Sequence, residues 1–184
     1  VLEEQTMGQT PTAAEAVASI RSGMRVFVHG GAATPKALLD ALSRREDLRD
    51  VTLYHLHTEG CESFLAPEQA GRLRSRSLFT GPAARGAVQD GRADFVPVFL
   101  SDIPGLFASR RIPLDAALVQ LSPADAHGLH TLGTSCDSAR AAVDSAPIVI
   151  AEVNTRMPRT CGHTVVDPQR IHAFVKADRA LPVH

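Results

Sequence analysis

The chain has 184 residues and a mass of 19.6 kDa, enough for one domain with a full hydrophobic core and little for two. Its 19 lysines and arginines are balanced by 20 aspartates and glutamates, so we expect no nucleic-acid partner. Three cysteines without a C-x-x-C pair indicate a reducing compartment, and no apolar run approaches the roughly 18–20 residues that span a bilayer. We therefore expect a cytoplasmic protein with no membrane partner.

Four helices are predicted from capping residues and apolar periodicity. In chain order they begin near residues 12, 34, 81 and 137 and end near residues 22, 44, 91 and 146. The first starts at a capping box formed by Thr12 and Glu15. The second takes Thr34 as its N-cap and Pro35 as its first residue, and Asp137 caps the fourth.

Six short apolar segments, most of them rich in β-branched residues, are predicted to be strands. They are VFV (26–28), VTLYHLH (51–57), SLF (77–79), FVPVFL (95–100), AALVQL (116–121) and IVIAEV (148–153). Several are apolar on both faces, as buried parallel strands are. Their alternation with helices predicts an α/β fold with a mostly parallel sheet flanked by helices on both faces. The arginines of RLRSRSLF (72–79) alternate as on the solvated face of a strand.

Each predicted strand is followed by a loop of small, polar, Gly or Pro residues. Because the carboxyl ends of parallel strands share one edge, where ligands bind in open α/β sheets, we expect a ligand-facing edge there. Gly30 and Gly31 allow close approach to the backbone, and amides at the start of the next helix are free to meet a phosphate or carboxylate. The segment matches neither the dinucleotide-binding nor the P-loop glycine pattern.

Other chemistry-bearing residues give weaker indications. His127 and His130 share a loop but lack the spacing of a metal site, so no metal is expected. His55 and His57 lie on one strand segment, where a hydrogen-bonded core or edge histidine is commoner than a ligand. No G-x-S-x-G motif indicates a serine hydrolase.

Four longer blocks of sequence, taken together, resemble one known family. They are VFVHGGAATPKALLDAL (26–42), LFTGPAARGAVQDGRADFVPVFLSDIPGLF (78–107), LDAALVQLSPADAHGLHTLGTSCD (114–137) and AEVNTRMPRTCG (151–162). In this order they resemble the acetyl-CoA hydrolase/transferase family, the class I CoA-transferases that include acetate and 4-hydroxybutyrate CoA-transferases. The likeness covers residues 12–178. It implies the CoA-transferase-like (NagB-RpiA-like) fold, with coenzyme A as a substrate rather than a tightly bound cofactor.

The resemblance also implies a domain organisation. Residues 1–184 correspond to a single α/β domain, the amino-terminal half of a two-domain enzyme whose carboxy-terminal catalytic domain is absent from this chain. In the family a glutamate carboxylate attacks an acyl-CoA, forms a glutamyl-CoA thioester and passes CoA to a short carboxylic acid. Because that glutamate belongs to the other domain, we expect no catalytic residue here. The chain alone should be inactive, with a second domain or subunit as partner and a homo-oligomer as the assembled enzyme.

Two loops should wall the acyl pocket and exclude water, because the resemblance places them on the cleft between the domains. Their pocket-lining residues are Gly30, Gly31, Thr34, Met157, Pro158, Arg159, Thr160 and Gly162. For Arg159 we consider two roles, steering of a carboxylate substrate and a structural salt bridge. His163 stands where the family has an acidic or amide residue, so the usual contact there is not carried over.

Three alternatives stay open at this point. Acyl-CoA hydrolysis shares the thioester chemistry. A stand-alone binding or assembly module predicts a surface without an exposed apolar face, whereas a missing second domain predicts an apolar patch at the strand-end edge. A sugar-phosphate isomerase related to ribose-5-phosphate isomerase would need Glu59 or Asp102 as its acid or base.

Overall fold

The computed structural model describes residues 10–183, and its centre is a parallel sheet. The strands are β1 (Arg25–Val28), β2 (Val51–His55), β3 (Leu73–Ser77), β4 (Ala93–Phe95), β5 (Ala116–Leu121), β7 (Ile148–Asn154) and β9 (Ala173–Ala177). They form a seven-stranded sheet in the order β4-β3-β2-β1-β5-β7-β9, with every neighbouring pair parallel. The predicted α/β fold is confirmed. The direction of winding reverses between β1 and β5, which makes this gap the switch point of the sheet.

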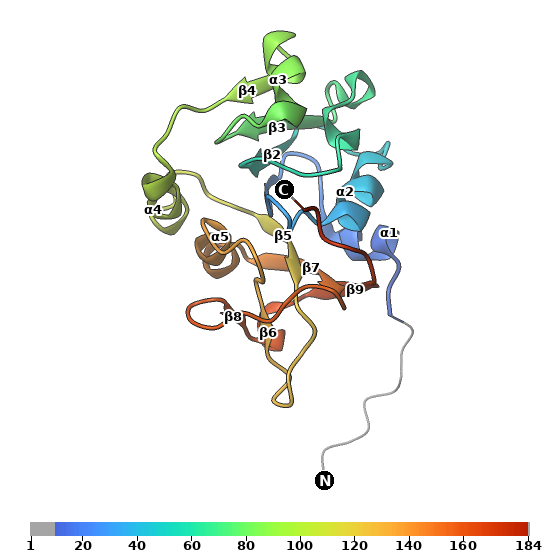
Figure 1. Ribbon diagram of the computed structural model, residues 1–184. Helices are drawn as coiled ribbons and strands as arrows, with labels where there is room; N and C mark the ends of the chain where they lie inside the picture. The colour runs from blue at the N-terminus through green and yellow to red at the C-terminus, as the bar shows by residue number, and fades with distance from the viewer. Residues whose placement is uncertain (1–9, 184) are drawn as a thin grey trace.

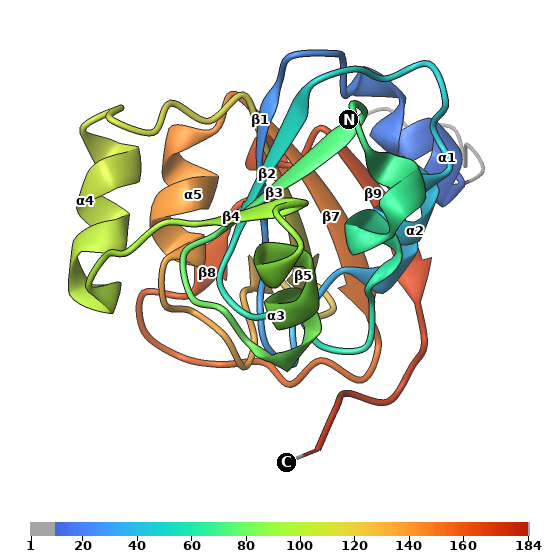
Figure 2. The ribbon, with the colours of Figure 1, turned by 90° about the horizontal axis from the view of Figure 1, so that it is seen from above.

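Helices cover both faces of this sheet. They are α1 (Ala13–Ala16), α2 (Lys36–Ser43), α3 (Pro82–Gln89), α4 (Ile103–Ala108) and α5 (Ala139–Ser145). Single 3₁₀ turns add η1 (Val17–Ser19), η2 (Ser63–Leu65), η3 (Pro67–Gln69), η4 (Leu100–Asp102) and η5 (Pro168–Arg170). Figures 1 and 2 show α4 and α5 on one side of the sheet and α1 and α2 on the other. A separate antiparallel pair, β6 (His130–Thr131) with β8 (Val165–Val166), lies below the sheet in Figure 1.

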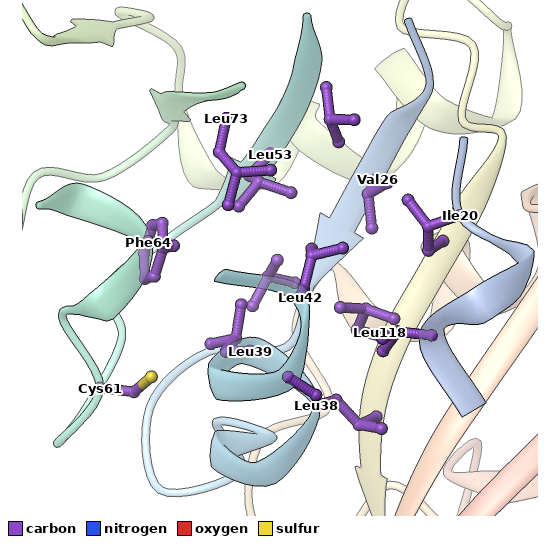
Figure 3. Packing of buried hydrophobic residues seen from close by; sticks show 14 of the residues in the cluster. Ile20, Val26, Leu38, Leu39, Leu42, Leu53, Cys61, Phe64, Leu73 and Leu118 are labelled. Atoms are coloured by element: carbon purple, nitrogen blue, oxygen red, sulfur yellow. The ribbon is translucent and has the colours of Figure 1, made fainter. Parts of the chain in front are cut away.

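The core beneath α1, α2 and α3 is built from aliphatic side chains. Figure 3 shows the α2 residues Leu38, Leu39 and Leu42 against Val26, Leu53 and Leu118 of three adjacent strands. All six are fully buried. Each such side chain contributes about 1.5–3 kcal/mol when it leaves water.

The opposite core lies beneath α4 and α5. Phe27 of β1 meets Phe107 of α4 edge to face, with ring centroids 5.6 Å apart. Its neighbours Val26 and Val28 point into the first core, so successive residues of β1 serve opposite faces. This explains why the predicted strands are apolar at consecutive positions.

Two predicted strands differ from the structure. The strand predicted at 77–79 lies earlier, at β3, where buried and exposed residues alternate and the outward Arg74 and Arg76 pair with Asp94. The segment predicted at 95–100 stops being a strand after Phe95, because Pro97 has no N–H to donate to a sheet ladder. The loop expected there continues instead into η4 and the helix α4, and the strands β6, β8 and β9 were not predicted.

Two predicted helix starts have different outcomes. The capping box is confirmed, since Thr12 N donates to Glu15 Oε2 at 2.7 Å and Glu15 N donates to Thr12 Oγ1 at 3.3 Å. However, α1 ends at Ala16 and continues only as a 3₁₀ turn. The second helix begins at Lys36, so the prediction that Thr34 is its N-cap is wrong.

Candidate functional site

The turn after β1 packs against the end of β2 through its two glycines. Gly31 N donates to His57 O at 2.9 Å, and Gly31 has a φ of +57°, which favours glycine. A Cβ on Gly30 would lie 2.7 Å from His57 O. The glycine pair therefore serves close packing of two chain segments at the switch point.

Thr34 closes this turn from the inside. It is buried, and its hydroxyl donates to Gly31 O at 2.7 Å. The Thr34 hydroxyl oxygen also accepts from the Glu59 backbone amide at 3.0 Å. Thr34 therefore holds the glycine turn and the loop after β2 in one arrangement.

A side-chain carboxylate of this chain is hydrogen-bonded to the N-terminus of α2. The Ala37 amide donates to Glu152 Oε2 at 2.8 Å, and Glu152 is a fully buried residue of β7. Arg179 pairs with the other carboxylate oxygen at 2.8 Å. A helix start favours a negative charge, and Glu152 supplies it from within the fold. The Ala37 amide is therefore not free to meet a ligand phosphate or carboxylate.

His29 ties the turn to the loop before α5. Its Nδ1 accepts from Gln120 N at 3.3 Å, so the ring proton is on Nε2, which donates to Ser135 O at 2.5 Å. Burial lowers the pKa of His29, which favours the neutral ring. His29 was not predicted as a site residue; its one signal in the sequence is a polar residue directly after an apolar strand.

The loop after β7, which holds the predicted pocket residues 157–162, packs against the same loop before α5. Met157 is buried, and a Cβ on Gly133 would overlap its Sδ and lie 2.5 Å from its Cγ. Thr160 Oγ1 donates to Gly133 O at 3.2 Å. On the other side, a Cβ on Gly31 would lie 3.0 Å from Ser135 Oγ. The loop 133–135 therefore contacts both predicted pocket segments, the glycine turn at Gly31 and the loop that holds Met157 and Thr160.

The remaining predicted residues lie farther out. Pro158 and Gly162 are exposed. Of the two roles predicted for Arg159, the structure shows the salt bridge. Its Nη2 lies 2.6 Å from Asp125 Oδ2, and its Nη1 donates to Leu129 O at 2.8 Å. The backbone amide of Leu129 and the nearby Arg159 charge both lower the pKa of Asp125.

The two histidines at the end of β2 differ in their surroundings. His55 is fully buried, donates from Nδ1 to Leu56 O and bonds through Nε2 to Ser75 Oγ at 2.6 Å. Burial lowers the pKa of His55 to about 4, so it is a neutral core residue, as predicted. The ring of His57 instead meets Phe79 edge to face at 5.7 Å.

The sheet edge at β3 and β4 carries exposed large apolar side chains, here called the apolar rim. Its members are Phe79, Phe95, Phe99 and Leu100, whose exposed fractions are 57%, 51%, 79% and 57%. All four lie at or after the carboxyl ends of β3 and β4. Such a group of exposed large apolar side chains is typical of a surface that another protein segment covers.

In residues 10–183, no helix is long and apolar enough to cross a membrane. No three histidine, cysteine or acidic side chains of this part of the chain gather as metal ligands do.

Known proteins resemble this chain along nearly all of its length. The profile of the acetyl-CoA hydrolase/transferase N-terminal domain matches residues 3–182. The chain is 46% identical over 146 residues to a succinyl-CoA:acetate/propanoyl-CoA:succinate CoA transferase of Fasciola hepatica, covering 78% of this chain and 30% of that protein. It is 35% identical over 171 residues to a 4-hydroxybutyrate coenzyme A transferase of Clostridium kluyveri, covering 92% of this chain and 40% of that protein.

A solved structure agrees with these relatives. The crystal structure of RipA from Yersinia pestis matches with a TM-score of 0.88 and 30% sequence identity, covering 95% of this chain and 44% of that chain. The chain therefore spans between 30% and 44% of the length of these three proteins. It belongs to the acetyl-CoA hydrolase/transferase family, of which it carries the N-terminal domain.

Proposed function

We propose that this chain is the amino-terminal domain of a CoA-transferase that moves CoA between an acyl-CoA and a short carboxylic acid. The reaction passes through a glutamyl-CoA thioester, and the glutamate lies outside this chain. The chain is therefore inactive alone, and a second domain or subunit completes the enzyme.

The observation that carries this proposal is the exposed apolar rim at the carboxyl ends of β3 and β4, on the same edge of the parallel sheet as the hydrogen-bonded turn at the switch point. The turn is held by hydrogen bonds of the buried side chains of Thr34 and His29. The exposure of Phe99 and Leu100 in the rim supports the proposal, because a further domain that closes over the strand ends needs an apolar surface to cover. In the proposed enzyme, the glycine turn forms one side of the substrate cleft and the second domain forms the other.

In this proposal the chain positions and shields the reactants. The wall consists of Gly30, Gly31, Thr34, Met157, Pro158, Thr160 and Gly162. Apolar cover excludes water from the glutamyl thioester, so that a carboxylate rather than water attacks it. Arg159 supports the wall through its bond to Asp125 instead of steering substrate.

The test uses the full-length gene product and, separately, the 184-residue chain. Each is mixed with acetyl-CoA or succinyl-CoA and with acetate, propionate or succinate, and CoA esters are quantified by mass spectrometry. We expect ping-pong transfer by the full-length protein and none by the chain. Borohydride should inactivate the enzyme only after acyl-CoA has been added, because it reduces the thioester.

Three outcomes would contradict this proposal. Transfer by the chain alone refutes its inactivity. Release of free CoA without an acceptor indicates an acyl-CoA hydrolase. Absence of both reactions in the full-length protein favours a stand-alone binding module.

A further inference from the structure

An ion pair between the buried Glu152 and the partly buried Arg179 connects three parts of the chain that are distant in sequence. Glu152 of β7 receives the Ala37 amide on Oε2 and Arg179 on Oε1, where Nε donates at 2.9 Å and Nη2 lies at 2.8 Å. Arg179 follows β9, and its Nη2 also donates to Thr34 O at 2.6 Å. One guanidinium thus contacts both the cap of α2 and the backbone of the glycine turn.

Two further buried groups complete the connection. Gln120 of β5 donates to Thr34 O at 3.1 Å, and its own oxygen accepts from Asn154 at 2.7 Å. Asn154 in turn donates to Arg179 O at 2.9 Å and accepts from Arg179 N at 3.2 Å. The backbone of Arg179 is therefore fixed as firmly as its side chain.

We propose that Glu152 and Arg179 are a positioning pair: they set the conformation of the turn 30–35 so that its wall stands at the right distance from the reacting carbonyl. This inference rests on the proposed function for its catalytic consequence. Its structural consequence, a turn that loosens without the pair, does not depend on that function.

The geometry favours positioning over mere stabilisation. A carboxylate alone would cap α2, yet Arg179 adds a bond to Thr34 O, the carbonyl that also accepts from the Lys36 amide where the turn meets α2. The hydroxyl of Thr34 bonds Gly31 and the Glu59 amide, so a shift of residue 34 moves both neighbours. Displacing catalytic surroundings by about 1 Å can lower a rate about 100-fold.

The first experiment changes Arg179 in the full-length protein. We expect Arg179→Met to lower kcat/KM about 100-fold, mainly through kcat, because the wall is misplaced in the transition state. Arg179→Lys should recover part of kcat, since an ammonium reaches either Glu152 or Thr34 O but not both in bidentate fashion. The matched control is Arg156→Met, which removes the exposed pair between Arg156 and Asp178 at the ends of the same strands.

The double variant Glu152→Gln/Arg179→Met separates the two roles. Arg179→Met alone leaves a buried charge without its partner, which destabilises the fold, whereas the double variant leaves no buried charge. Its glutamine oxygen can still accept from Ala37. We expect the melting temperature to recover in the double variant while kcat/KM stays low. Recovery of both would show a structural pair and overturn the inference.

Hydrogen exchange tests the pair without any reaction. In peptides covering residues 29–40 of the full-length protein, we expect Arg179→Met to exchange at least 10-fold faster than the unchanged protein, and Arg156→Met to exchange at its rate. If the unchanged protein transfers no CoA but this contrast holds, the proposed function fails and the positioning pair stands. Equal exchange in the two variants overturns the pair, whatever the activity.

Discussion

Gly133 and Met157 show how a single missing side chain shapes the candidate site. Gly133 has a φ of +65°, and its open side is filled by the thioether of Met157. A Cβ at this position meets both left-handed strain and a buried side chain. Met157 can therefore occupy this space only because residue 133 has no side chain.

Gly133→Ala should lower the free energy of unfolding by roughly 2–4 kcal/mol, as the sum of backbone strain and displaced packing. Urea unfolding measures this loss. The matched control is Gly128→Ala, because Gly128 has a φ of +79° and a methyl group there would meet nothing within 4 Å. It should lose only the strain, about 1–2 kcal/mol. Equal losses at the two glycines would show that Met157 gives way without cost.

His55 should make the protein less stable in mild acid. Burial lowers its pKa in the folded state to about 4, from an ordinary value of 6.5. The unfolded chain thus binds the proton first, so the contribution of neutral His55 is complete above pH 6.5 and is lost as the pH falls toward 4. The full effect is on the order of 3 kcal/mol.

The measurement is urea unfolding of the chain at several pH values between 7 and 4. We expect His55→Gln to flatten the dependence on pH, while the unchanged His29 leaves a remaining slope of the same sign. His127→Gln serves as control, because His127 is exposed. A slope that stays the same in His55→Gln would mean that another group carries the acid sensitivity.

At the scale of elements, local signals account for the helix starts that the sequence predicted correctly. The Thr12 and Glu15 pair lies within four residues and closes on itself, so it is readable without the fold. Thr12→Ala should cost about 1 kcal/mol in urea unfolding. Ser101→Ala, which alters an exposed hydroxyl, should cost less than half of that. A neutral Thr12→Ala would show that α1 is held only by its packing.

The start of α2 could not be predicted in the same way. Its cap is the carboxylate of Glu152, 115 residues from Ala37. The hydroxyl of the nearer Thr34 bonds Gly31 O and the Glu59 amide instead. Periodicity and turn residues carry no information on such a partner, which exists only after β7 is placed next to β5. The parallel sheet was predictable from alternating apolar strands and helices. Glu152, Gln120 and His29 were not, because their partners are 86 to 115 residues away in sequence.

The bounds of β4 show a second limit of pattern reading. Residues 95–100 are apolar enough for a strand, yet Pro97 ends the ladder and leaves Phe99 and Leu100 in water. Hydrophobicity alone does not distinguish a buried strand from an apolar surface that awaits a partner. The family resemblance predicted an apolar patch at the strand-end edge, but it did not identify these residues as its members.

For the whole molecule, the apolar rim predicts how the 184-residue chain behaves in solution. We expect self-association through Phe99 and Leu100, and the variant Phe99→Ser/Leu100→Ser should sediment as a monomer at the same concentration. Phe174→Ser is the control, because Phe174 is 41% exposed but lies on the opposite edge strand β9. If the unchanged chain is monomeric, or if only Phe174→Ser disperses it, the rim is not the contact surface.

The contact between Arg179 and Thr34 joins residues 145 positions apart, and this has a consequence for synthesis on the ribosome. The glycine turn is translated early, but Arg179, which bonds Thr34 O, emerges only with the last residues of the described chain. Before residue 152 emerges α2 has no cap from Glu152, and before residue 179 emerges the turn lacks its bond to Arg179. Contacts of such long sequence separation form late in folding. We therefore expect nascent chains arrested before residue 173 to be cut by protease within 29–40, and chains that expose residue 179 outside the ribosome to resist.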